Sequence, residues 1–346
     1  MVVFDRTAFT GEHSTPLLID LVSRSRVTEP KFRYDNYGYV VAGLVLERVT
    51  GKKWQDLLDE IIFEPAGMTR TSASESETSN WPWAIPYDSS PDGLERLVMS
   101  KTDRTMHAAG GIATTAADLL RWLELNINHG RIGDVQVLPR EAFETAHRQQ
   151  ADVDARFGPY RRFGYALGWY WSDYDGQTLL HHFGGFAGWR AHVSFNPETK
   201  DGVAVVTNTS GFGFDLPDLI ANYVYDRTVH EDRIAALRKE IDEGRQKIRE
   251  HAAERAARKP TLLHDLSVYT GRYSNYEMGD LTIVRSGSDL RASIGQLDSR
   301  LEPYTEPETA RVELVPGSGD VLRFDFDDAG RVKAVVWRGE RFEKRD

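Results

Sequence analysis

The chain has no cysteine among its 346 residues, which excludes disulfides and thiolate catalysis. No apolar run approaches the roughly 18 residues of a membrane-spanning helix, so we expect no membrane span. Positive charge is scarce, because 43 Lys and Arg stand against 53 Asp and Glu and give a net charge of −10. This balance provides no electrostatic footprint for nucleic acid or for an anionic membrane surface.

Motifs that hold cofactors are missing as well. The sequence has no phosphate-cradling loop, no zinc-protease helix and no calcium loop, so we expect neither a cofactor nor a metal. The N-terminus carries no signal-peptide pattern. The chain as given is therefore expected in the cytoplasm, and the compartment of any longer product stays open.

Hydrophobic content of 40% and charged content of 28% fit a soluble globular protein of about two domains. Strands are expected to follow one another at hairpin spacing between two groups of helices. This order predicts an α+β fold in which helices flank an antiparallel sheet. The expected helices are 17–25, 38–49, 54–62, 115–127, 139–147 and 215–228, and the expected strands are 166–172, 178–182, 189–195 and 203–208.

Local signals set several of these boundaries. The apolar stretch 38–49 ends at Gly51, a natural helix C-cap, and its length favours a buried helix over a strand. Thr115 has the character of an N-cap, with Asp118 three residues later. Residues 70–100 have a loop-like composition.

The pattern changes after residue 228. Residues 230–258 are highly charged at helical spacing, which predicts a linker helix or a helix for a partner. Short alternating strands then run from 269 to 337 and predict a small β-sandwich or barrel. The expected domains are 1–228, 229–260 and 261–346.

Four motifs occur in an order that carries chemical information. They are Tyr34-Asp35-Asn36, the Pro-x-Gly-Met turn in 63–71, the Gly-Gly segment in 109–119, and His182-Phe183-Gly184-Gly185. Together they resemble the β-lactamase-related serine hydrolases, which include class C β-lactamases, penicillin-binding-protein-like enzymes, D-aminopeptidases and esterases. Residues 265–346 are similar to the small β domain appended to some of these enzymes. The resemblance implies that the first domain is an incomplete β-lactamase/transpeptidase-like domain.

The resemblance implies hydrolysis of an ester, amide or lactam in a small-molecule or peptide substrate, through an acyl-enzyme. Tyr34 would share the proton transfers, and Asn36 would hold a substrate carbonyl. His182 would donate a hydrogen bond near the leaving group, and the Gly185 N–H would stabilise the oxyanion. The residues with an implied role are Tyr34, Asn36, His182 and Gly185 in catalysis, and Gly184 and Trp189 in substrate binding.

The nucleophile motif Ser-x-x-Lys is absent from all 346 residues. Thr28-Glu29-Pro30-Lys31 has the spacing with threonine, but its proline argues against a helix, and Thr50-Gly51-Lys52-Lys53 reads as a helix end. We therefore expect no nucleophile, a neutral Tyr34, and little or no activity. The chain is interpreted as N-terminally truncated, with the missing segment or a second copy as its partner.

Other interpretations stay open at this stage. The chain could be a non-catalytic ligand-binding homologue, or the product of a mis-started or split gene whose complete form is active. His181 and His182 could form a metal site with His192 or His107, although no ligand spacing supports one. A truncated domain would also expose an apolar face of the sheet, which predicts poor solubility or dimerisation.

Overall fold

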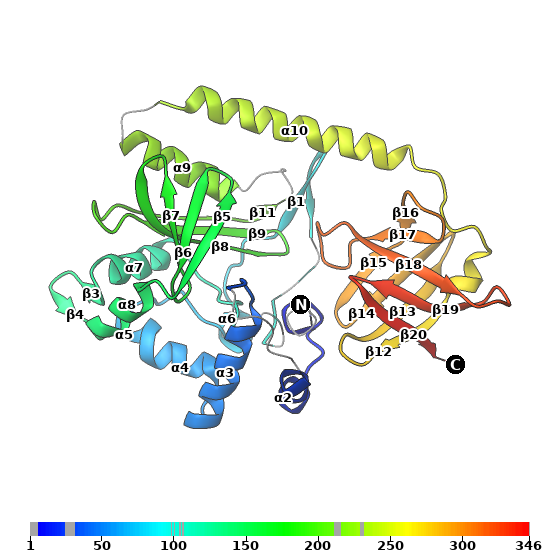
Figure 1. The fold of residues 1–346 in the computed structure, drawn as a ribbon, viewed down its shortest axis with the longest axis horizontal. Helices are drawn as coiled ribbons and strands as arrows, with labels where there is room; N and C mark the ends of the chain where they lie inside the picture. Colours follow the sequence, from blue (N-terminus) through cyan, green and yellow to red (C-terminus); the bar gives the residue numbers. More distant parts are fainter. Residues whose placement is uncertain are drawn as a thin grey trace.

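A six-stranded antiparallel sheet forms the centre of the N-terminal lobe (Figure 1). The computed structural model describes residues 6–24, 32–97, 99, 101–103, 105, 107–210, 216–228 and 232–345. The strand order is β10-β9-β8-β7-β6-β5, so neighbours in sequence are neighbours in space. The strands are β5 (Ala151–Phe157), β6 (Tyr160–Tyr165), β7 (Tyr170–Tyr174), β8 (Gln177–Phe186), β9 (Trp189–Phe195) and β10 (Gly202–Thr207).

Helices cover both faces of this sheet. On one face, Ala221 and Tyr225 of α9 (Leu216–Thr228) pack with Leu179 in one apolar cluster. On the other, Leu123 of α7 (Ala116–Ile127) packs with Phe195. The predicted α+β class with a helix-flanked antiparallel sheet is confirmed.

The start of α7 is set by its own side chains. Thr115 lies at the N-cap, and its hydroxyl accepts a hydrogen bond from the Asp118 N–H at 3.2 Å, as predicted. The Asp118 carboxylate accepts from the Arg70 N–H and the Thr71 hydroxyl, both at 2.8 Å. The helix start is thereby joined to the Pro-x-Gly-Met turn.

Helix α3 (Tyr37–Thr50) follows the Tyr-x-Asn loop and ends at Gly51, whose φ of 72° closes the helix as predicted. The expectation that this helix is buried is wrong. Val40 packs against Leu18 of α2, but Val49 is 78% exposed. The other helices are α2 (Thr15–Arg24), α4 (Trp54–Leu58), α5 (Glu64–Ala66), α6 (Glu75–Thr78) and α8 (Arg140–His147), with π-helical turns η1 (Arg6–Thr10) and η2 (Asp59–Phe63).

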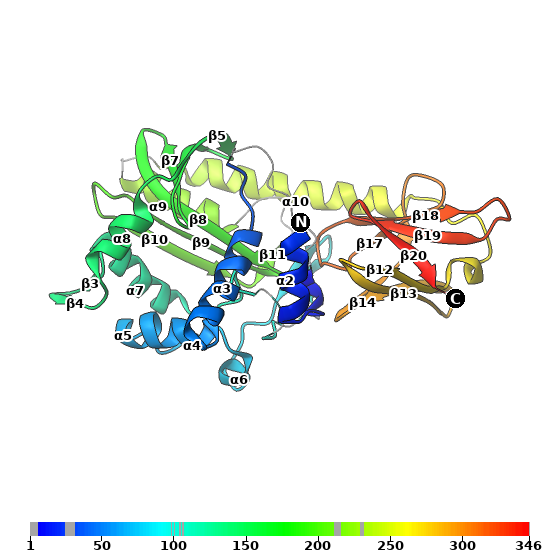
Figure 2. The same ribbon diagram turned by 60° about the horizontal axis from the view of Figure 1, so that its bottom comes forward.

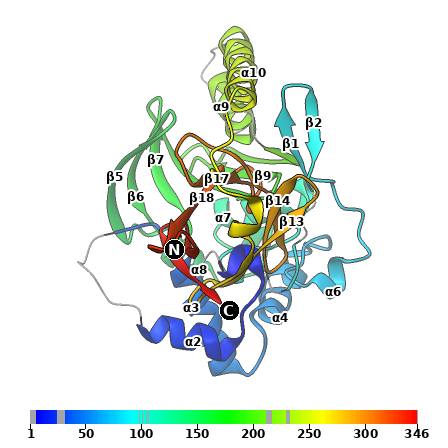
Figure 3. The same ribbon diagram turned by 90° about the vertical axis from the view of Figure 1, so that its right-hand side faces the viewer.

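Several hairpins of the N-terminal lobe were not predicted. One is β5–β6, the edge of the main sheet; another joins β1 (Tyr87–Ser90) to β2 (Gly93–Arg96) inside the expected loop and projects away from the main sheet (Figure 3). β1 also pairs in parallel with β11 (Thr209–Ser210). The predicted strand 166–172 starts too early, because Gly168 at φ 84° forms a turn before β7. A short pair, β3 (Arg131–Ile132) and β4 (Val135–Gln136), follows α7.

The long helix α10 (Ile234–Ala256) runs from the N-terminal lobe to the C-terminal β lobe (Figure 1). Three boundaries of the predicted helices, at residues 25, 215 and 230, lie outside the described residues. Among the described residues, no helix has the length and apolar character to cross a membrane.

The C-terminal lobe is a single nine-stranded antiparallel sheet that nearly closes on itself. The Ser299 hydroxyl of β15 accepts from the Glu313 N–H, which follows β17, and so links the two ends of the sheet. A 3₁₀ turn η3 (Leu266–Tyr269) precedes the first strand. The strands are β12 (Gly271–Asn275), β13 (Gly279–Ser286), β14 (Asp289–Ile294), β15 (Leu297–Arg300), β16 (Glu302–Pro303), β17 (Thr309–Val312), β18 (Asp320–Phe326), β19 (Val332–Trp337) and β20 (Glu340–Arg345).

The N-terminal segment lies between the two lobes (Figure 2). Phe9 stacks on Phe186 at the tip of the β8–β9 hairpin, with ring centroids 6.0 Å apart. The backbone oxygen of Phe9 accepts from the Gln296 side chain at 2.7 Å. Phe9 therefore links the β8–β9 hairpin to Gln296 of the C-terminal lobe. The domain boundaries at 228/229 and 260/261 stay a prediction.

Candidate functional site

The Tyr-x-Asn loop meets strand β8 at the surface of the main sheet. The Tyr34 ring lies 5.8 Å from the His182 ring and 6.0 Å from the Tyr170 ring, measured between centroids. The Tyr34 hydroxyl donates to the Asn36 side-chain oxygen at 3.2 Å. Three residues expected to act together, Tyr34, Asn36 and His182, are thus brought together from distant parts of the chain.

Contacts on both sides of the loop hold it against the sheet. The Phe32 ring lies 4.8 Å from the Tyr165 ring of β6, and the Tyr39 hydroxyl lies 3.2 Å from that of Tyr165. Within the loop, the Asp35 carboxylate accepts from the Tyr37 N–H at 2.8 Å and turns the chain into α3. Asn36 occupies the N-cap position of α3 but makes no capping bond, so its side chain is left to contact Tyr34.

His182 is a neutral imidazole with a fixed tautomer. Its Nδ1 lies 2.7 Å from the carbonyl oxygen of Phe183, and because a carbonyl only accepts, Nδ1 carries the proton. Burial lowers the pKa of His182, and the nearby Arg162 guanidinium lowers it further. The Nε2 atom therefore presents a lone pair at neutral pH. This arrangement makes it a proton acceptor, in contrast to the hydrogen-bond donor expected from the sequence.

Tyr34 is a neutral phenol. Burial, followed by the neighbouring Tyr170 and Tyr39, raises the pKa of Tyr34 to about 12. Arg162 acts in the opposite direction, but its effect is smaller than that of burial. The neutral state at pH 7 agrees with the expectation for a site whose lysine is absent. Tyr34 as a whole residue is still 39% exposed, so a ligand can reach it.

The glycines after His182 leave backbone open at the surface. Gly184 and Gly185 pair with Ala191 and Arg190 of β9, and both are exposed. A side chain at Gly185 would collide with Arg190, because a Cβ there would lie 2.0 Å from its Nη1. A mostly apolar recess of about 310 Å³ begins at this point; its lining includes His182, Gly184, Trp122, Trp169, Leu167 and Val193.

Trp189, expected to contact substrate, lies at the far end of the hairpin. Its indole N–H donates to the Ala84 carbonyl at 3.0 Å, and its ring lies 6.1 Å from that of Trp83. These contacts tie it to the segment before β1. The structure thus groups Gly184 with His182 around the recess and places Trp189 in a separate aromatic contact.

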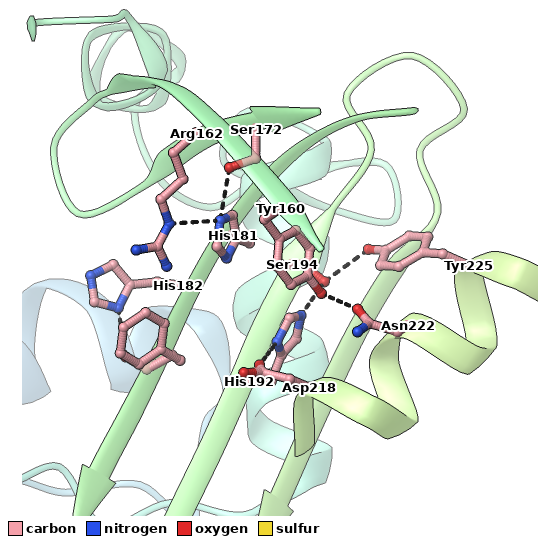
Figure 4. A network of polar contacts seen from close by, with 11 residues as sticks. Tyr160, Arg162, Ser172, His181, His182, His192, Ser194, Asp218, Asn222 and Tyr225 are labelled. Atoms are coloured by element: carbon pink, nitrogen blue, oxygen red, sulfur yellow. Dashed lines mark hydrogen bonds and ion pairs between the residues drawn. The ribbon is translucent and has the colours of Figure 1, made fainter. Parts of the chain in front are cut away.

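A second polar network lies on the α9 face of the sheet and was not predicted (Figure 4). Asp218 of α9 lies 2.5 Å from His192 Nδ1, and His192 Nε2 lies 2.7 Å from the Ser194 hydroxyl. This order of acid, imidazole and hydroxyl is that of a catalytic triad. However, Ser194 is 0% exposed and lies 2.9 Å from the Tyr225 hydroxyl of α9. The network therefore joins α9 to β9 and offers no hydroxyl to a ligand.

The sequence also raised His181 and His107 as possible metal ligands, and both make other contacts in the structure. The hydrogen bonds of His181 are with Ser172 and Arg162 (Figure 4), whereas His107 packs on Trp54. In the part of the chain that the structure describes, no group of three or more His, Asp or Glu side chains is arranged to hold a metal ion. The segment 28–31 lies outside the described residues, and Gly51 in 50–53 is a helix C-cap.

Comparisons with known proteins bear on the fold. The chain is 20% identical to the octameric penicillin-binding protein homologue from Pyrococcus abyssi, with a TM-score of 0.50 over 99% of this chain and 77% of that one. It is 18% identical to the D-amino acid amidase from Ochrobactrum anthropi SV3, with a TM-score of 0.51 over 66% and 72%. These likenesses confirm the β-lactamase/transpeptidase-like fold.

Sequence comparison identifies the family. The chain is 24% identical to penicillin-binding protein 4 of Amycolatopsis lactamdurans over 51% of this chain and 46% of that protein. It is 27% identical to an unguisins hydrolase of Aspergillus violaceofuscus over 52% and 35%. The chain thus spans less than half the length of these relatives. The sequence model described as Beta-lactamase matches residues 13–224, more than half of the chain. The protein therefore belongs to the β-lactamase-related serine hydrolase family.

Proposed function

We propose that the site around Tyr34, Asn36 and His182 is the part of an acyl-hydrolase site that these 346 residues provide. Its substrate would be an ester, amide or lactam. The observation that carries the proposal is the meeting of the Tyr34 and His182 rings, with the Asn36 amide bonded to Tyr34 and exposed glycine backbone next to them. Positioned groups of this kind contribute to acyl transfer by orienting substrate and by stabilising charge.

Each residue has a role that follows from its protonation state. The Asn36 amide N–H would donate to the substrate carbonyl, and the Gly185 N–H would stabilise the oxyanion. His182 Nε2, which is free of a proton, would accept one. Tyr34, a neutral phenol, would pass a proton to or from the leaving group without serving as the starting base.

Turnover by these residues alone would be small. The sequence has no Ser-x-x-Lys, and the triad-like Ser194 is fully buried. Removing the nucleophile from comparable sites leaves about 10³–10⁴-fold acceleration over water, from the remaining binding and electrostatic groups. We therefore expect these residues to bind an acyl substrate reversibly without forming an acyl-enzyme.

A fluorescent penicillin tests both parts of the proposal in one sample. Because a relative is a penicillin-binding protein, a β-lactam is the first probe to use. Fluorescence polarisation should rise on adding the chain, and unlabelled benzylpenicillin should reverse the rise. His182→Ala should weaken binding about 10-fold, near 1.4 kcal/mol. His251→Ala, an exposed histidine on α10, serves as the matched control and should leave binding unchanged.

The same sample is then denatured to reveal any covalent bond. We expect no fluorescence on the denatured protein. A stoichiometric adduct would show that an activated hydroxyl exists, and Ser194→Ala would identify or exclude the triad-like serine. Binding that is insensitive to His182→Ala would contradict the proposed site.

A further inference from the structure

The turn that joins β8 to β9 has an unusual residue at its tip. Phe186 pairs with Trp189, so Ala187 and Gly188 form a two-residue loop. The φ angles of these two loop residues are 30° and 89°. Two positive φ values are typical of a type I′ turn, whose first loop position favours Asn, Asp or Gly. Local turn preference therefore does not account for alanine at this position, because a residue with a Cβ rarely adopts a positive φ.

The turn at the other end of β8 has the favoured residues. Asp175 and Gly176 join β7 to β8 between the paired residues Tyr174 and Gln177, and their φ angles are 50° and 80°. Both loop residues are exposed. The two ends of one strand thus have turns of the same length and the same sign of φ, and of this pair the β8–β9 turn departs from the favoured Asp-Gly sequence.

Ala187 is buried against the C-terminal lobe. It is 9% exposed, and it belongs to an apolar cluster whose other members, apart from Met99, come from that lobe. Phe186 packs against the same cluster, and the β8–β9 hairpin points toward the C-terminal lobe (Figure 1). On the other side of the turn, a Cβ at Gly188 would lie 2.8 Å from the Cβ of Pro86. The tip of the hairpin is thus held between the C-terminal lobe and the segment before β1.

The part of β8 that carries the site depends on this tip for its position. β7 pairs with β8 as far as His181, and beyond that residue β8 pairs with β9 alone among the described strands. This section of β8 contains His182 and Gly185 and ends at the turn. A section that is hydrogen-bonded along one edge opens more readily than a section paired on both sides. The anchor at the turn therefore affects where the Gly185 N–H lies.

We propose that Ala187 is a positioning residue, through which the C-terminal lobe holds His182 and Gly185 in place for the ligand. This inference rests on the proposed function and adds the C-terminal lobe to the parts of the molecule that shape the site. A positive φ at a residue with a Cβ persists where the surrounding structure enforces it. The methyl group of alanine can be buried in the apolar contact with the lobe, whereas the polar side chain of Asn or Asp at the same position would lose its hydration.

Ala187→Asn separates the turn from the lobe contact, because asparagine suits a type I′ turn but places an amide in the apolar contact. We expect its affinity for benzylpenicillin to fall about 10-fold and the NMR amide signals of Gly184 and Gly185 to shift. Ala187→Gly suits the positive φ and keeps the contact apolar, so its affinity should stay within about 2-fold of the wild type. Asp175→Asn places asparagine at the matched position of the exposed turn; it is the control and should change neither measurement.

Hydrogen exchange on the wild-type chain provides a second measurement that needs no variant. The Trp189 amide follows the β8–β9 turn, and the Gln177 amide has the matched position after the β7–β8 turn. After correction for intrinsic rates, the Trp189 amide should exchange at least about 10-fold more slowly, because the contact with the C-terminal lobe must open first. Equal exchange at the two amides would overturn the proposal even if no variant folds.

The outcomes separate this inference from the proposed function. Unchanged Gly184 and Gly185 signals in a folded Ala187→Asn protein, checked by thermal melting, would overturn the positioning role. If these signals shift but the wild-type chain binds no penicillin, Ala187 still positions the strand and the proposed acyl-hydrolase site fails. If penicillin binding depends on His182 but is the same in Ala187→Asn, the proposed function stands and only the positioning role is removed.

Discussion

Buried imidazoles are a residue-scale feature that affects how this molecule responds to pH. Burial lowers the pKa of four histidines in the described structure: His107, His147, His181 and His182. For His147 the value falls from 6.5 to about 4, with the nearby His129 as the second cause. Its Nε2 lies 2.9 Å from the Asn126 side-chain oxygen, so the neutral ring donates to that oxygen.

These histidines lower the free energy of unfolding at acidic pH. Between pH 6.5 and about 4 the unfolded chain binds protons that the folded His147 does not, so the free energy of unfolding falls as the pH falls. Each such histidine contributes up to about 1.4 kcal/mol per pH unit. Urea denaturation at several pH values should show this loss, and His147→Gln, which keeps the donor to Asn126, should make the slope shallower. His251→Gln on the exposed face of α10 is the control; an equal slope for wild type and His147→Gln would contradict the assignment.

The Tyr34 loop shows how residue-scale contacts set chemistry. Asn36 makes no capping bond at the start of α3, and its side-chain oxygen accepts from the Tyr34 hydroxyl. Tyr34 keeps its proton because burial outweighs the effect of the Arg162 charge. The sequence alone predicted this neutral state, since it lacks the lysine that would favour the phenolate.

At the scale of elements, helix α3 carries exposed apolar side chains next to the Tyr34 loop. Its buried residues Val40 and Gly43 face α2 and the loop at 107–108, while Val45, Leu46 and Val49 are exposed. From the sequence we expected the exposed apolar surface to lie on the main sheet. In the structure, α7 and α9 cover that sheet, whereas Val45, Leu46 and Val49 of α3 are exposed among the described residues.

This face predicts self-association of the chain. Size-exclusion chromatography with light scattering should show dimers or larger species whose share rises with concentration. Val49→Lys should shift the population toward the monomer, because a charge on the apolar face opposes its burial. Val135→Lys changes an exposed valine in the separate β3–β4 turn and should have no effect. A wild-type chain that stays monomeric at high concentration would contradict the prediction.

Elements with local signals were predicted well, and those defined by tertiary contacts were not. Gly51 and Thr115 mark helix ends through bonds within a few residues, so the sequence contains the signal. Strand β5 is the sheet edge, where exposed polar residues hide the alternation that identifies a strand. In β6 burial does alternate, but Arg162 is buried and Phe163 is exposed, which reverses the expected polarity. Arg162 in particular stands in a basic pair, and only the fold shows that one arginine of the pair is buried.

At the scale of the whole molecule, function depends on contacts between distant segments. The four motifs predicted the family, because their order along the chain is itself informative. No sequence motif marks Asp218, His192 and Ser194 as a group, because their contact depends on how α9 packs on β9. Likewise, the contact of Phe9 with Phe186 joins the N-terminal segment to the hairpin of the site.

The central claim is that the folded chain brings Tyr34 and His182 into one ligand site. Nuclear Overhauser spectroscopy on a chain labelled at Tyr and His rings tests it most directly, with Tyr34→Phe and His182→Gln used for assignment. Ring centroids 5.8 Å apart predict a cross-peak between the two rings, and benzylpenicillin should shift both sets of signals. The absence of that cross-peak, or a titration that moves neither ring, would contradict the account.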